Sequence, residues 1–72
     1  MFREELRKLR IKTLKKQAEM AKELNVPYET YKTWERGFCL PSFENYEKIL
    51  TYAKKNHYFK GIEQAYIEEK KG

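Results

Sequence analysis

The side chains in this chain that could do chemistry are suited to recognition, and several of them recur along residues 28–36. If this segment is helical, one exposed face carries five hydrogen-bonding side chains: Tyr28, Glu29, Lys32, Thr33 and Arg36. In the major groove of DNA, lysine can donate to guanine and glutamate can accept from cytosine. The face therefore suits contact with base edges.

Residues before this segment add further groups that suit DNA. Gln17 can pair bidentately with adenine. Arg10, Lys15 and Lys16 would hold phosphates, helped by the N–H groups of a helix N-terminus. Residues 1–16 carry seven basic and two acidic residues, which equals the net charge of +5 of the whole chain. A basic segment beside a reading helix is typical of DNA-binding proteins, although a solvated helix face accounts for this charge equally well.

The sequence lacks the patterns that catalysis and metal binding need. His57 is the only histidine, Cys39 is the only cysteine, and no other residues stand at metal-ligand spacing. There is no glycine-rich phosphate loop, and no serine, threonine or cysteine has an evident base partner. We therefore expect no catalytic residue, no metal, no cofactor and no small-molecule substrate, and the chain is not expected to be an enzyme.

The elements that must position the recognition groups are two short helices within residues 17–37. Ala18, Ala21 and Leu24 form an apolar stripe on the first helix, with Met20 beside them. Asn25 tolerates a left-handed backbone and can begin a sharp turn. Pro27 suits the first position of the second helix, and Gly37 suits its C-terminal end.

Two helices joined by so short a turn predict a helix-turn-helix motif, whose second helix is the usual reader of the major groove. Tyr31 and Trp34 should turn inward from that helix. Val26 should be buried at the corner between the two helices.

The rest of the chain predicts an all-α bundle of about five short helices in a single domain of residues 1–72. The first helix contains Leu6 and Leu9 and ends near Lys12. A fourth helix covers about 42–54, with Ser42 as its N-cap, and a fifth covers about 58–70, with a possible interruption at Gly61. We expect Phe43 and Tyr46 to pack in the core, and we expect the loop at residues 38–40 to fold back onto it.

Apolar surface on the last two helices exceeds what a four-helix core can readily cover: Tyr52, Tyr58, Phe59, Ile62 and Tyr66. Such a patch either marks a protein contact or is covered when the fifth helix packs across the fourth. No segment is long and apolar enough for a membrane span or a signal peptide, and the lone thiol suits a reducing compartment. We therefore expect a cytoplasmic protein without a membrane partner.

Roughly residues 6–53 resemble the Cro and cI-type repressors of phages, which belong to the lambda-repressor-like family. The resemblance rests on scattered positions and on one specific run: Leu9, Arg10, Gln17, Ala21, Leu24, Val26, Thr30, Trp34-Glu35-Arg36-Gly37, Pro41 and Ser42. It implies a regulator in a lysis–lysogeny type switch of a bacterial host, which binds operator DNA as a possible homodimer. It also implies a structural ion pair between Arg10 and Glu35, so Arg10 has two alternative roles.

The reading face also fits a different partner. Its charges balance, and Tyr28 and Tyr31 are bulkier than the residues usual in the family. Tyrosines are favoured at protein interfaces. The alternative is an antirepressor that binds a phage repressor protein through this face and blocks its DNA binding, as in the similar modulator-of-repression proteins of temperate lactococcal phages.

Overall fold

The computed structural model describes residues 1–71, and the expected domain of 1–72 is therefore seen up to its penultimate residue. These residues form five α-helices and no β-strand: α1 (Phe2–Lys12), α2 (Gln17–Glu23), α3 (Tyr28–Arg36), α4 (Phe43–Lys55) and α5 (Phe59–Lys71). The predicted all-α fold is confirmed. Both α4 and α5 begin and end one residue later than expected.

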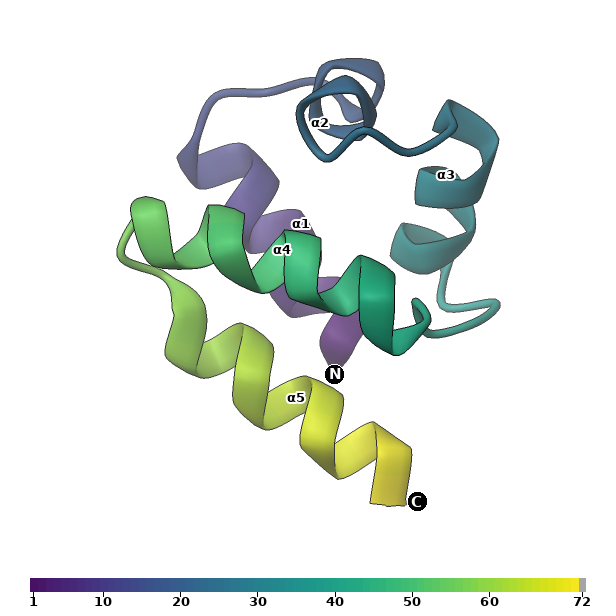
Figure 1. The fold of residues 1–72 in the computed structure, drawn as a ribbon, viewed down its shortest axis with the longest axis vertical. Helices are drawn as coiled ribbons and strands as arrows, with labels where there is room; N and C mark the ends of the chain where they lie inside the picture. Colours follow the sequence, from purple (N-terminus) through teal and green to yellow (C-terminus); the bar gives the residue numbers. More distant parts are fainter. Residues whose placement is uncertain (72) are drawn as a thin grey trace.

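α1 packs mainly against α3 and α5. In Figure 1, α4 crosses in front of α1, α5 runs below both, and α2 and α3 lie at the opposite end. The helix pairs in closest contact are α1 with α5, α1 with α3, α2 with α3, and α4 with α5. None of the helices within residues 1–71 is both long enough and apolar enough to cross a membrane.

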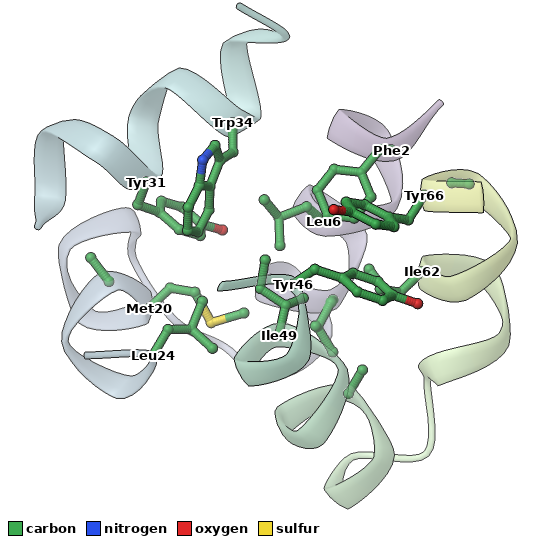
Figure 2. Packing of buried hydrophobic residues seen from close by; sticks show 14 residues of the cluster. Phe2, Leu6, Met20, Leu24, Tyr31, Trp34, Tyr46, Ile49, Ile62 and Tyr66 are labelled. Carbon is green, nitrogen blue, oxygen red and sulfur yellow. The ribbon is translucent and has the colours of Figure 1, made fainter. Parts of the chain in front are cut away.

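The core draws side chains from all five helices (Figure 2). Leu6 and Leu9 of α1 are fully buried at its centre. Tyr46 of α4 stacks on Tyr66 of α5 with 3.8 Å between ring centroids, and Phe2 meets Tyr66 edge-on at 5.7 Å. Burying each large apolar side chain contributes about 1.5–3 kcal/mol, so this aromatic group stabilises the docking of α5.

The apolar surface on the last two helices does not form an exposed patch. Ile62 and Tyr66 are buried, and Tyr52, Tyr58 and Phe59 are half-buried against the core. α5 contacts α1 as well as α4, and this second contact covers the excess apolar surface. Of the two alternatives, the covered one is correct.

Gly61 does not interrupt α5. The helix is continuous from Phe59 to Lys71. A Cβ at residue 61 would lie only 2.4 Å from Oε1 of Glu5, the same oxygen that accepts a 2.7 Å hydrogen bond from the Tyr58 hydroxyl. The glycine therefore lets α5 approach α1 closely.

Two expectations about the core are wrong, at Phe43 and at the start of the loop 38–40. Phe43 is 65% exposed because it is the first residue of α4, whose first turn projects beyond the core, whereas Tyr46 one turn later is buried. In the loop 38–40, Phe38 is 73% exposed and Cys39 is also exposed, whereas Leu40 packs half-buried against the core as expected. The N-cap role of Ser42 is confirmed, because its Oγ accepts from the Asn45 amide at 3.3 Å.

The apolar stripe of α2 also differs from the expected one. Ala18 is exposed, and Met20 is buried in its place together with Ala21 and Leu24. The three buried residues lie at i, i+1 and i+4, which places them on one side of so short a helix. Ala18, one residue after the start of α2, faces away from this side.

Candidate functional site

The connection between α2 and α3 sets the relative positions of the two helices. Asn25 has φ 57°, the left-handed conformation expected for it, and the Val26 amide donates to the carbonyl of Ala21 at 3.0 Å. Val26 is half-buried rather than fully buried. Pro27 is extended (φ −62°, ψ 143°) and caps α3, so Tyr28 and not Pro27 is the first helical residue.

Glu35 lies at the centre of a hydrogen-bond network that joins α1, α2 and α3. Its Oε2 accepts from Nε of Arg10 at 2.7 Å and from the Tyr31 hydroxyl. Its Oε1 accepts from Nη2 of Arg10 at 3.3 Å and from Nε2 of Gln17 at 3.2 Å. The ion pair between Arg10 and Glu35 that the family resemblance implied is therefore present.

The network keeps Glu35 ionised although its side chain is only 5% exposed. Burial raises the pKa of Glu35, but hydrogen bonds from Arg10, Tyr31 and Gln17 outweigh this effect and leave its pKa below the usual range. The same pairing raises the pKa of Arg10. Burial, together with the hydrogen bond to Glu35, raises the pKa of the Tyr31 hydroxyl.

The network also fixes the amide of Gln17. One of its N–H groups donates to Glu35, which leaves the carbonyl oxygen and the second N–H for an outside partner. A flipped amide would place its oxygen against the Glu35 carboxylate, so the donor and acceptor positions of Gln17 are set.

On the exposed face of α3, more side chains interact with neighbours on the same helix than the sequence predicts. Tyr28, Glu29 and Arg36 are exposed, as expected. Lys32 is half-buried, because its ammonium lies 3.3 Å from Glu29 and 4.7 Å from the centre of the Tyr28 ring. Thr33 is half-buried, and its hydroxyl donates to the Thr30 carbonyl at 2.6 Å. The expectation of full exposure is therefore wrong for Lys32 and Thr33.

The three candidates for phosphate binding differ in whether their cationic groups are already paired within the chain. Lys16, the N-cap of α2, is exposed and its ammonium makes no salt bridge within residues 1–71. Lys15 pairs with Glu23 at 3.5 Å. Arg10 is tied to Glu35, and its Nη1 also donates to the Lys15 carbonyl at 3.0 Å. Of the two roles open to Arg10, the structural one is observed.

Sequence reasoning missed two contributions to this region. It placed Tyr31 inward but did not assign its hydroxyl to Glu35. It counted Arg3 and Arg7 only as part of a basic segment, whereas both line a cleft together with Arg36. Their i, i+4 spacing with Arg10 three residues further puts them on one side of α1, and this spacing was the available signal.

A second cleft, of about 500 Å³, lies at the corner between α2 and α3 and is mainly apolar. Its walls come from both helices and from the turn: Ala18, Ala21, Lys22, Asn25, Val26, Pro27 and Tyr28. The exposed ring of Tyr28 stands at its edge. The corner thus offers apolar surface next to the polar face of α3.

Residues 1–71 contain no group of three histidine, cysteine, aspartate or glutamate side chains that could hold a metal ion. No protein-family model matches the chain, and no curated protein or solved structure matches it either.

Proposed function

We propose that this chain is a small helix-turn-helix transcription regulator of the Cro and cI type, which binds operator DNA in a phage lysis–lysogeny switch. The observation that carries the proposal is the Glu35 network. It ties the start of α2, through Gln17, to the middle of α3 and the end of α1. A reading helix needs such a rigid support, because base contacts depend on side-chain positions held to a fraction of an ångström.

In this proposal α3 enters the major groove and α2 lies across the backbone. Gln17 presents a fixed carbonyl oxygen and N–H, and Lys16 beside it meets a phosphate. Arg36 and Tyr28 contact bases or phosphates from the exposed face of α3. Lys32 and Glu29 exchange their mutual ion pair for contacts with guanine and cytosine, at a cost that limits affinity.

Footprinting on the regulatory region upstream of the gene for this chain tests the proposal. A two-fold dimer should protect two half-sites about one helical turn apart. Lys16→Ala should weaken protection of every site alike, whereas the exposed Lys60→Ala on α5 should leave it unchanged. Protection that spreads evenly along the whole duplex, without borders, and increases with protein concentration would contradict operator binding.

A second candidate function is supported by the state of Lys32. Because this lysine is neutralised by Glu29 and covered by Tyr28, the face of α3 presents less positive charge than a groove-binding helix usually does. The apolar cleft beside Tyr28 adds surface suited to a protein partner. In this alternative the chain is an antirepressor that binds a phage repressor and blocks the DNA binding of that repressor.

Binding to the purified repressor of the same phage, measured by calorimetry, separates the two functions. An antirepressor should form a complex that Tyr28→Ala disrupts and that competes with operator DNA for the repressor. A chain that binds its operator and shows no affinity for the repressor would rule out this second candidate.

A further inference from the structure

Three arginines gather around one cleft at the C-terminal end of α3, and only one of them, Arg36, also belongs to the proposed recognition face. The cleft is open to solvent and has a volume of about 510 Å³. Arg3 and Arg7 of α1 and Arg36 of α3 line it, together with Phe38 and two glutamates, Glu4 and Glu35.

The positive charge in this cleft is not balanced by its own carboxylates. Glu35 is occupied by Arg10, and Glu4 lies 3.2 Å from the N-terminal ammonium. Within residues 1–71, none of the three arginines that line the cleft makes a salt bridge. Three guanidinium groups therefore face the cleft with no anionic partner.

Two contacts hold the arginines in place. Nη1 of Arg3 donates to the Arg36 carbonyl at 3.4 Å, and the stem of Arg3 crosses Gly37, where a Cβ would lie 2.9 Å from its Cδ. The guanidinium of Arg36 lies 5.9 Å from the centre of the Phe38 ring. These contacts fix two of the three charges at the rim of the cleft and leave most of their N–H groups free.

The cleft also has an apolar part. Phe38 is 73% exposed, although it is a large aromatic residue next to the core. Guanidinium groups bind carboxylates bidentately, and an exposed aromatic ring beside them offers contact to an apolar side chain. The exposed ring beside the arginines favours a ligand that carries apolar groups as well as negative charge, and the phosphate backbone of DNA offers only the charge.

From these observations we propose that the cleft lined by Arg3, Arg7, Arg36 and Phe38 binds an acidic segment of a protein partner, with carboxylates on the arginines and an apolar side chain against Phe38. This site shares Arg36 with the polar face of α3, and it shares no residue with the apolar cleft at the α2–α3 corner. Its other residues, Arg3, Arg7 and Phe38, take no part in the proposed binding of operator DNA or of a repressor.

The test uses the full chain and a short synthetic peptide of glutamates around one phenylalanine, with binding followed by NMR chemical shifts. The peptide should shift the amides of residues around Arg3, Arg7 and Phe38. A double variant, Arg7→Gln with Arg36→Gln, should weaken binding about tenfold or more, since each charge-assisted hydrogen bond is stronger than a neutral one. Phe38→Ala should also weaken binding. Lys60→Gln removes one positive charge elsewhere on the surface and should have no effect.

Two controls keep the result decisive. Arg7 and Arg36 are exposed, so the double variant should unfold at the same temperature as the wild type. A peptide with glutamine in place of glutamate should not bind. If the acidic peptide binds equally to the double variant, the proposal is wrong. If a scrambled DNA duplex shifts the same residues and displaces the peptide, the cleft is a phosphate site and the proposal is wrong for that reason instead.

Discussion

Nε of Arg10 lies 2.7 Å from Oε2 of Glu35, and this ion pair links α1 to α3. Both side chains are largely buried, and Tyr31 and Gln17 supply further hydrogen bonds to the same carboxylate. Removing one partner of a buried ion pair strongly destabilises the fold, because the remaining charge stays buried without compensation.

Glu35→Gln should lower the free energy of unfolding by about 3 kcal/mol, because Arg10 then stays buried without a counter-charge. Glu29→Gln is the matched control, since the Glu29 side chain is 83% exposed, and it should cause little change. Urea unfolding followed by circular dichroism measures both. Equal, small effects would show that the network contributes nothing beyond a surface ion pair.

Tyr31→Phe should weaken the dependence of stability on acid pH. The pKa of Glu35 is lowered in the folded chain, so its contribution is complete above the unfolded value of 4.5 and is lost as pH falls through the lower folded value. Removing the Tyr31 hydroxyl should raise that folded pKa and cost about 1 kcal/mol at neutral pH.

The comparison is a series of thermal unfolding scans from neutral to acid pH. The difference in unfolding temperature between the wild type and Tyr31→Phe should become smaller as Glu35 is protonated. Tyr46→Phe removes a hydroxyl that makes no hydrogen bond within residues 1–71 and should show no such trend. A gap that stays constant with pH would mean that Tyr31 acts only through packing.

Much of the fold follows from residue spacing, because a helical period identifies the side of a helix that is buried. Tyr31 and Trp34 were placed inward on this basis, and both are buried. Local chemistry was equally reliable at Asn25 and Ser42, where one side chain tolerates a left-handed backbone and the other caps a helix.

The errors arise where the outcome depends on a neighbouring element. Phe43 has the right spacing for the core but lies in a first turn that no helix covers. The aromatic residues of α5 are covered because α5 reaches α1, a contact between distant parts of the chain. In the candidate site, the ties of Gln17 to Glu35 and of Lys32 to Tyr28 likewise depend on three-dimensional position, which spacing does not give.

Gly37→Ala should destabilise the chain by about 1–2 kcal/mol, because φ is 81° at this residue and a Cβ strains a left-handed backbone. The new methyl group would also press on the stem of Arg3. Gly37→Asn should cost less than Gly37→Ala, since asparagine tolerates this conformation. Chemical denaturation of both variants gives the order, and the reverse order would show that crowding by Arg3, and not backbone strain, decides the effect.

Under the proposed function, two adjacent residues should affect DNA binding differently. Gln17→Ala should cost about 1–3 kcal/mol on the operator and relax sequence preference, whereas Lys16→Ala should weaken binding to all duplexes and reduce the salt slope by about 1. Circular dichroism must show that Gln17→Ala still folds, because it also loses the bond to Glu35. Identical losses on every sequence for both variants would argue against base readout by Gln17.

The most direct test of the proposed function is fluorescence anisotropy of the purified chain against labelled duplex from its own regulatory region, titrated from low to physiological salt beside a scrambled duplex. The proposal predicts specific binding that survives physiological salt, with a slope that corresponds to several neutralised phosphates. Weak binding that is equal on both duplexes and is lost as salt rises would contradict operator binding and would leave the repressor as the partner to test.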